Sequence, residues 1–250
     1  ISEERCKEFD YISKVTLQEI DAFRIDETKW ADPSEEFIKW PMGNPAIGEE
    51  QNIAPYFDNN GNNIYEPSEG DYPSFEQNNS RNIPDMMLFV IYNDKGNIHT
   101  ESEGLPIGLE LQTTCFAYTT NDEINNMTFY RTVVINRGNE TIDSCVFGQW
   151  VDPDLGNYAD DYVECDVPRN LGICYNGDDN DEGTFGYGLN PPSVGVTFFE
   201  GPRRPDGSEI GLTKFVYYNN DFGLQGNPTR PEHFWGYLNG RWKDGAPITY

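Results

Sequence analysis

Residues 86–92 read MMLFVIY, an apolar run that ends directly before the turn residues NDKGN at 93–97. Five further strand-like runs follow it along the chain, at residues 109–119, 127–136, 144–151, 194–199 and 214–218. Such runs, alternating with clusters of turn residues, are typical of antiparallel strands. The sequence therefore predicts a mainly β protein, an antiparallel β-sandwich with long loops and short helices at both ends.

The helices are expected outside the region of predicted strands. Thr16 and Glu19 have the spacing of a capping box, so a helix should begin directly after Thr16. A second short helix is predicted over residues 34–40 and a closing helix over residues 231–243. We therefore divide the chain into a helical N-terminal segment, residues 1–49, and a β-sandwich domain, residues 50–250.

The chain is strongly acidic, with 43 Asp and Glu against 17 Lys and Arg, and a formal net charge of -26 over 250 residues. This charge repels nucleic acids and anionic membrane surfaces and attracts divalent cations. The longest apolar run, residues 86–92, is too short to span a bilayer, so we expect no membrane insertion. Because the sequence begins at Ile1 rather than Met, we expect a processed or excised piece of a longer protein.

Residues 150–166, WVDPDLGNYADDYVECD, place six carboxylates among apolar residues, which indicates a folded acidic loop. Crowded carboxylates repel one another unless a cation lies between them, and calcium accepts several oxygen ligands in irregular loops. The predicted calcium ligands here are Asp152, Asp154, Asp160, Asp161 and Asp166. The alternative interpretation is a solvated loop without an ion. We prefer that interpretation for a further acidic cluster, Asp178, Asp179, Asp181 and Glu182.

Another calcium loop, the first along the chain, is predicted in residues 58–69, DNNGNNIYEPSE, because five of their positions match the EF-hand loop. The predicted ligands are Asp58, Asn60, Asn62, the carbonyl oxygen of Ile64, and Glu69, with Asp71 directly beyond them. Asn63 occupies the position that usually holds Gly, and Asn is the next residue best able to adopt left-handed backbone angles. The alternative interpretation is an Asn-rich turn.

Five cysteines stand at positions 6, 115, 145, 165 and 174, without the CxxC spacing of zinc sites. We predict a disulfide between Cys165 and Cys174, which enclose the short loop CDVPRNLGIC. A second is predicted between Cys115 and Cys145, on neighbouring predicted strands, which leaves Cys6 free or bonded outside this chain. Acidity and cysteines together favour an oxidising, calcium-rich exterior.

Signals of catalysis are scarce in this sequence. The two histidines, His99 and His233, stand far apart, and no HExxH, GxSxG, P-loop or GxGxxG pattern occurs. Acidic pairs of the kind that glycosidases use are abundant, but an acidic calcium-binding protein contains such pairs by chance. We therefore expect a protein that is not an enzyme.

Five long segments carry a resemblance to a known family. They are APYFDNNGNNIYEPSEGDYP (54–73), FVIYNDKGNIHTESEGLPIGLEL (89–111), FGQWVDPDLGNYADDYVECD (147–166), GYGLNPPSVGVTFFEGP (186–202) and KFVYYNNDFG (214–223). Together they resemble a region of large secreted proteins of the Bacteroidota, which typically end in a type IX secretion sorting domain. The resemblance implies an extracellular location at the outer cell surface and carries over no established enzymatic activity. Relatives usually have Gly in place of Asn63 and often Cys in place of Asn157, which implies a different partner for Cys165, such as Cys174.

These observations lead to three hypotheses on function. The first is a non-catalytic structural or adhesive module of a Bacteroidota surface protein, made rigid by calcium and disulfides, whose partners are other protein chains or further domains of the same protein. The alternative is a carbohydrate-binding module, with exposed Trp or Tyr rings stacked on a glycan. The least favoured is a hydrolase of unknown type. Buried aromatic residues favour assembly over glycan binding, and we expect Trp30 and Trp40 to pack against the sheet.

Overall fold

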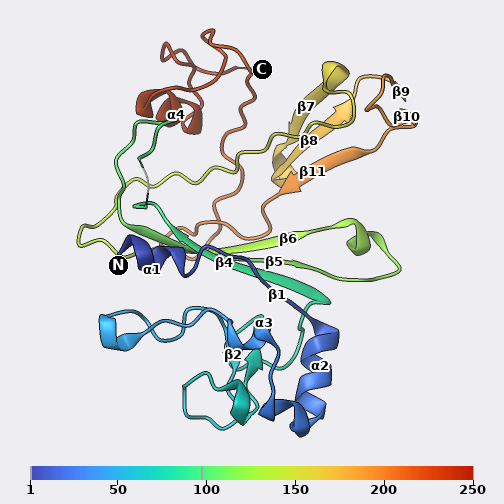
Figure 1. Cartoon of the computed structure of the whole chain (residues 1–250). Coiled ribbons are helices and arrows are strands. Elements are labelled where there is room, and N and C mark those ends of the chain that lie inside the picture. Colours follow the sequence, from blue (N-terminus) through green and yellow to red (C-terminus); the bar gives the residue numbers. More distant parts are fainter. Residues whose placement is uncertain (1, 97, 250) are drawn as a thin grey trace. The chain divides into compact units, whose positions relative to one another are not determined.

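The computed structural model describes residues 2–96 and 98–249, which divide into two compact units. The first unit consists of Ile1–Ile98 and Pro106–Thr141, and the second of His99–Leu105 and Ile142–Tyr250. Figure 1 shows the elements of each unit, coloured along the chain. The division differs from the predicted boundary after residue 49, because the N-terminal segment shares one apolar core with the sheet that follows it.

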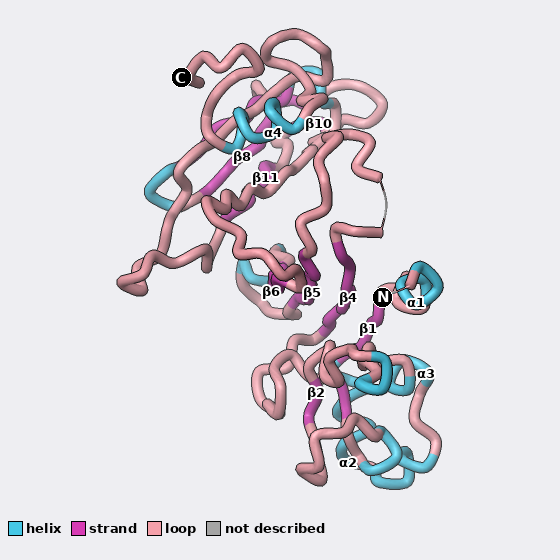
Figure 2. The backbone as a smooth tube through the Cα atoms, turned by 90° about the vertical axis from the view of Figure 1, so that its left-hand side faces the viewer, coloured by secondary structure: helices cyan, strands magenta, loops and turns pink. Residues whose placement is uncertain are grey.

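The first unit is built on an antiparallel sheet in the order β1-β4-β5-β6 (Figures 1 and 2). Its strands are β1 (Ser13–Thr16), β4 (Met86–Asn93), β5 (Leu109–Ala117) and β6 (Phe129–Asn136). The three longer strands confirm three of the predicted runs. In contrast, β1 lies inside the segment predicted as helical, and it pairs with β4 from Ser13 opposite Phe89 to Thr16 opposite Met86.

Three α-helices lie in the N-terminal segment: α1 (Glu3–Lys7), α2 (Leu17–Ile25) and α3 (Glu35–Ile38). The predicted capping box at the start of α2 is confirmed, because Thr16 Oγ1 accepts a hydrogen bond from Glu19 N at 3.3 Å and Glu19 Oε2 accepts one from Thr16 N at 2.8 Å. The remaining short elements of this unit are η1 (Glu27–Ala31), η2 (Pro45–Ile47), β2 (Tyr56–Phe57), η3 (Pro67–Glu69), β3 (Tyr72–Pro73) and η4 (Glu123–Asn126).

The core of the first unit joins α2, α3 and the β2–β3 pair to one face of the sheet. Figure 2 shows α2, α3 and β2 grouped together in the lower part of this view. Trp40 is 3% exposed, its ring lies 5.7 Å from that of Phe89 on β4, and its Nε1 donates a hydrogen bond to Pro55 O at 2.9 Å. Trp30 packs at the edge of the same core and donates from Nε1 to Phe23 O. The expectation that Trp40 packs against the sheet is therefore confirmed.

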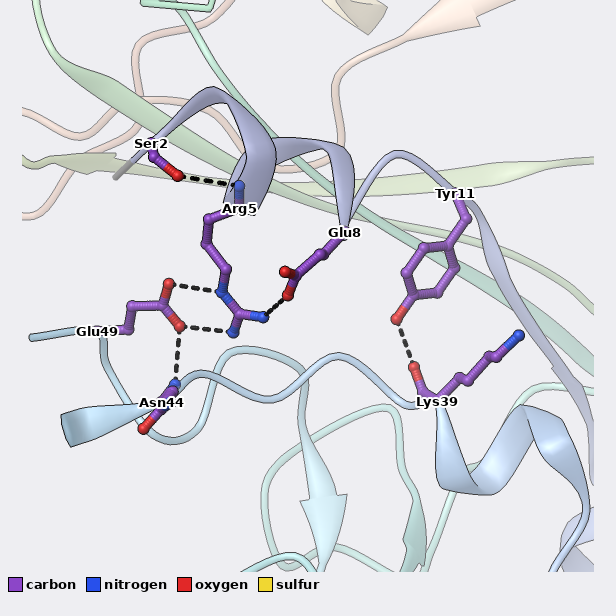
Figure 3. Close-up of polar contacts among 7 residues, drawn as sticks. All are labelled: Ser2, Arg5, Glu8, Tyr11, Lys39, Asn44 and Glu49. Atoms are coloured by element: carbon purple, nitrogen blue, oxygen red, sulfur yellow. Dashed lines mark hydrogen bonds and ion pairs between the residues drawn. The ribbon is translucent and has the colours of Figure 1, made fainter. Parts of the chain in front are cut away.

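A polar contact ties α1 to the segment that follows α3, as Figure 3 shows. The Arg5 guanidinium donates from Nε to Glu49 Oε1 at 2.9 Å and from Nη2 to Glu49 Oε2 at 2.7 Å, and it also pairs with Glu8. Glu49 Oε2 accepts a further hydrogen bond from Asn44 N at 2.8 Å. Only 5% of the Glu49 side chain is exposed, so this ion pair is largely shielded from water.

The second unit contains an antiparallel sheet in the order β11-β8-β7. Its strands are β7 (Asp161–Asp166), β8 (Leu171–Asn176) and β11 (Ser193–Thr197), and a small pair is formed by β9 (Asn180–Asp181) and β10 (Gly188–Leu189). The other elements are η5 (Tyr158–Asp160), η6 (Val167–Arg169) and α4 (Pro231–Leu238). Within the described ranges, no helix is long and apolar enough to traverse a bilayer.

Three predictions for the second unit need correction. Residues 150–166 are not one continuous loop, because their last six residues form β7. Residues 144–151 and 214–218 form no strand. Both segments instead contact α4. Gly148 of the first segment lies against Leu238, and the ring of Tyr218 in the second lies 5.4 Å from that of Tyr237. Val146, Phe147, Trp150 and Val151 are all exposed, so the apolar run at residues 144–151 is not a buried strand. A short apolar run does not by itself identify a strand.

All five cysteines are free thiols in the structure, so neither predicted disulfide is present. The strand register explains the first case, because Cys165 lies opposite Gly172 and Cys174 lies opposite Val163. The two cysteines are thus diagonal neighbours, and such pairs have Cα atoms roughly 7–8 Å apart, whereas a disulfide needs roughly 4.4–6.8 Å. Cys115 and Cys145 belong to different units, and the predicted strand over residues 144–151 is not formed.

Candidate functional site

The first predicted calcium loop is folded around the Asp58 carboxylate. Asp58 Oδ1 accepts hydrogen bonds from Gly61 N at 2.7 Å and Asn62 N at 3.3 Å, and Oδ2 accepts one from Asn63 N at 2.7 Å. The side-chain oxygens of Asn60 and Asn62 accept from backbone N–H groups two residues further on. Asn63 has a φ of 58°, which confirms the expectation that it adopts left-handed angles.

Asp71 lies directly after this loop in sequence and is fully buried, with 0% exposure. Its Oδ1 accepts a hydrogen bond from Asn59 N and its Oδ2 one from Glu66 N, both at 2.8 Å. Burial is the main cause that raises the pKa of Asp71, and the nearby carboxylates of Asp58 and Glu66 raise it further. The Asp71 carboxylate therefore connects Asn59 and Glu66 across the loop. Its burial disfavours the charged form, and the two N–H donors offset this effect only in part.

The side chain of Glu66, which is not among the predicted ligands, contacts this loop. The predicted ligand Glu69 contacts it through its backbone carbonyl. Asn62 Nδ2 donates to Glu66 Oε2 at 2.7 Å, which brings Glu66 into the loop. Glu69 lies exposed in η3, where its backbone carbonyl accepts from Asn59 Nδ2 at 3.0 Å. The signal was available, because Glu66 is position 9 of the EF-hand loop, where the ligand often acts through water.

The acidic residues of the second predicted loop are separated by the strand β7. Asp161 begins β7 and Asp166 ends it, so at about 3.3 Å per residue the two lie roughly 16 Å apart. Asp166 pairs with Arg169 and caps η6 through a hydrogen bond from Arg169 N. Asp152 and Asp154 are exposed in the segment before η5. The structure therefore does not bring Asp166 together with the other predicted ligands.

The charge of Asp161 is instead influenced by Asp181, which the sequence pattern places in a solvated turn. That interpretation is wrong for Asp181, which is 2% exposed, whereas Asp178, Asp179 and Glu182 are exposed. Asp181 Oδ1 accepts from Asn157 N at 3.1 Å and its Oδ2 from Tyr187 N at 2.8 Å. Asp181 thus joins the segment before β7 to the segment after β9, as Asp71 joins the ends of the first loop.

The environment of Asp161 is unfavourable for a negative charge. Burial is the largest cause that raises its pKa, and the carboxylates of Asp160, Asp181 and Asp154 raise it further, while a hydrogen bond from Leu155 N to Oδ2 at 3.0 Å lowers it. The remaining oxygen, Oδ1, is buried without a hydrogen-bond partner among the described residues, and so are Asp160 Oδ1 and Asn176 Oδ1. Unpartnered buried oxygens are uncommon in folded proteins.

A separate cleft of about 360 Å³ opens in the first unit beside β4, β5 and β6. Its polar lining includes Asn52, Gln77, Gln112, Thr114 and Arg131, and Phe89 is one of its apolar lining residues. The guanidinium of Arg131 lies 5.5 Å from the ring centre of Phe75. The cleft therefore offers amide and guanidinium groups for a polar ligand, with little exposed aromatic surface for stacking.

No protein family, curated protein or solved structure matches the chain. Within the described residues, no group of three or more His, Cys, Asp or Glu side chains is arranged to hold a metal ion. The oxygen-bearing side chains of both loops include Asn residues as well as carboxylates. Oxygen donors of this kind suit a hard cation such as calcium rather than zinc.

Proposed function

We propose that this chain is a non-catalytic structural or adhesive module of an extracellular surface protein, made rigid by calcium. The predicted β-sandwich and the resemblance to secreted Bacteroidota proteins belong to this proposal. The partners would be other protein chains or further domains of the same protein. The observation that carries the proposal is that its long irregular loops are folded around buried carboxylates, Asp71 in the first unit and Asp181 in the second.

Calcium supplies what these loops need physically. Asp71 is surrounded by Asp58 and Glu66, and Asp161 by Asp160 and Asp181, in a chain whose net charge is -26. A divalent cation bound beside each group would cancel two charges and relieve their repulsion. Calcium sites of extracellular modules have dissociation constants of roughly 0.1–1 mM, so such a protein would be stable in a calcium-rich exterior.

The melting temperature tests the proposal directly. A ligand that binds only the folded state stabilises it by about 1.4 kcal/mol when its free concentration is about tenfold above the dissociation constant. We expect the chain to melt at a higher temperature in millimolar calcium than in excess chelator, with magnesium giving a smaller shift. Coincident melting curves in calcium and in chelator would reject the role of calcium in this function.

Glycan binding is a second candidate, favoured by the cleft beside β4, β5 and β6. Amide and guanidinium groups such as those of Gln112 and Arg131 are suited to hydrogen bonds with sugar hydroxyls. We expect a glycan microarray to detect binding that Gln112→Ala and Arg131→Ala both remove, while Arg81→Ala outside the cleft retains it. Equal binding by all of these variants would exclude the cleft as the glycan site.

A further inference from the structure

Asp161 and Asn176 lie directly opposite each other at the last position of the β7–β8 ladder. Side chains at opposite positions of an antiparallel pair project from the same face of the sheet. Asn176 is 8% exposed, and the Oδ1 atoms of Asn176 and Asp161 are both buried without a hydrogen-bond partner among the described residues. Two neighbouring side chains therefore each keep an acceptor oxygen for which no donor is provided.

The orientation of the Asn176 amide follows from its other contacts. Its Nδ2 donates to the backbone carbonyls of Asp178 at 3.0 Å and Asn180 at 3.4 Å. A flipped amide would place its oxygen against these two carbonyl oxygens, so the hydrogen-bond network fixes which end is the oxygen. The group left without a partner is therefore an acceptor, and the ligand that completes it must be a donor or a cation.

Asp181, on the neighbouring strand β9, adds a third oxygen-bearing side chain whose charge acts on Asp161. Its carboxylate lies close enough to Asp161 to act on its charge, and each of its oxygens accepts one N–H bond and keeps a further lone pair. The backbone at Gly156 approaches so closely that a Cβ there would collide with Asp181 Oδ2. The carboxylate is thus held in place by the backbone around it.

We propose that Asp161, Asn176 and Asp181 form a calcium site at the end of the β7–β8 ladder. The inference rests on the proposed function and deepens it by naming ligands, since Asn176 and Asp181 join Asp161, which is the member of the sequence-based set that the site keeps. One ligand is an amide, so acidic side chains alone do not mark the site. Backbone carbonyls and water complete the six to eight oxygens that calcium takes.

A protonated Asp161 that donates a hydrogen bond to Asn176 Oδ1 is the competing explanation. The two explanations differ in whether loss of the Asp161 charge costs a bound ion. If calcium fills the site, Asp161→Asn loses that ion, although it relieves repulsion and leaves the calcium-free protein at least as stable as before. If Asp161 is a hydrogen-bond donor in a neutral pair, the same variant keeps every ion, because its amide NH₂ group can donate to Asn176 Oδ1 in place of the carboxyl proton.

The experiment uses the full chain, stripped with chelator and titrated with calcium chloride by isothermal titration calorimetry, with melting temperatures measured in parallel. The variants are Asp161→Asn, Asn176→Asp, Asp58→Asn in the first loop, and Glu164→Gln as a matched control. Glu164 lies on the same strand but is exposed on the opposite face. Glu164→Gln therefore removes one charge from β7 without touching the proposed ligands.

We expect Asp161→Asn to lose one bound ion or to weaken it by at least about tenfold, the loss already typical of outer-shell partners. Asn176→Asp should bind that ion more tightly while melting at a lower temperature in chelator, and Glu164→Gln should bind like the original chain.

An ion lost in Asp58→Asn but kept in Asp161→Asn would overturn this inference and leave the proposed function intact. No binding by the original chain would overturn both, and an Asp161→Asn variant that keeps every ion bound by the original chain would support the neutral pair.

Discussion

Arg5 and Glu49 are joined by two parallel hydrogen bonds across 44 residues of sequence, and the Glu49 side chain is 5% exposed. Two-pronged contacts of this kind are stronger than single ones and restrict geometry. We expect Arg5→Ala to lower the free energy of unfolding by about 2 kcal/mol, because it leaves a shielded carboxylate without its partner. Lys7→Ala is the matched control, since Lys7 and Glu3 form an exposed pair that contributes at most about 1 kcal/mol. Equal losses in the two variants, measured by urea denaturation, would contradict this assignment.

The same ion pair predicts how stability depends on pH. The hydrogen bonds from Arg5 are the largest cause that lowers the pKa of Glu49 below its ordinary 4.5. A carboxyl whose pKa is lower in the folded state stabilises the fold above its unfolded value, and this contribution is lost as pH falls through the folded value. The difference in melting temperature between the original chain and Glu49→Gln should therefore be full at pH 6 and shrink below about 4.5. A difference that stays constant down to pH 2 would show that the charge of Glu49 is not involved.

Asp71 offers a test of the first loop that does not depend on a metal. Asp71→Asn replaces one acceptor oxygen by an NH₂ group that faces the N–H of Asn59 or Glu66. We expect this variant to lose about 1–3 kcal/mol, the cost of a buried donor without an acceptor. Glu69→Gln, exposed in η3, should change stability by less than about 0.5 kcal/mol. Hydrogen exchange at Asn59 and Glu66 provides the local readout, and unchanged protection in Asp71→Asn would refute the role of this carboxylate.

The five free thiols predict the pattern of alkylation. Unreduced, denatured protein should take up five equivalents of iodoacetamide, as counted by mass spectrometry. In the native protein Cys145, which is exposed, should react first, and Cys174 should react last. Burial raises the pKa of the Cys174 thiol, with a smaller effect from Asp161, so it is both shielded and less reactive. Fewer than five equivalents without reductant would show that a disulfide forms in this chain.

Removal of calcium should loosen particular segments before the whole protein. We expect excess chelator to open residues 50–85 and 150–166 to protease first, because their carboxylates would then repel one another without a counter-ion. Fragments mapped by mass spectrometry identify the first cuts, and added calcium should suppress them. First cuts within β4 or β5 would show that the loops do not depend on calcium.

The parts of the fold that could be predicted from the sequence are those whose signals are local. The apolar run at residues 86–92 and the spacing of Thr16 and Glu19 predicted β4 and the start of α2. Strand β1 was missed because its four residues are recognisable only through pairing with β4, far along the chain. Strand β7 was missed because its charges obscured an alternation in which Tyr162 and Glu164 are exposed and Val163 and Cys165 are more buried.

The candidate site was predictable in composition but not in geometry. Residue types identified Asp58, Asn60, Asn62 and Asp161 as oxygen donors, whereas only the folded chain shows which of them meet. Asp166 and Asp161 are close in sequence, yet an extended strand separates them. Asn176 and Asp161 are distant in sequence, yet the ladder sets them opposite each other. Burial of Asp181 likewise depends on the backbone of Asn157 and Tyr187, which no local pattern encodes.

The pairing of β1 with β4 has a consequence for the order in which the chain folds. Strand β1 ends at Thr16 and its partner begins at Met86, so the sheet closes a loop formed by residues 17–85. Contacts between distant parts of a chain form slowly, because the loop entropy is lost before the contact is gained. During synthesis β1 and α2 emerge early but have no sheet to join until residues 86–89 are made. The emergence of β4 therefore sets the earliest moment at which the first core can form.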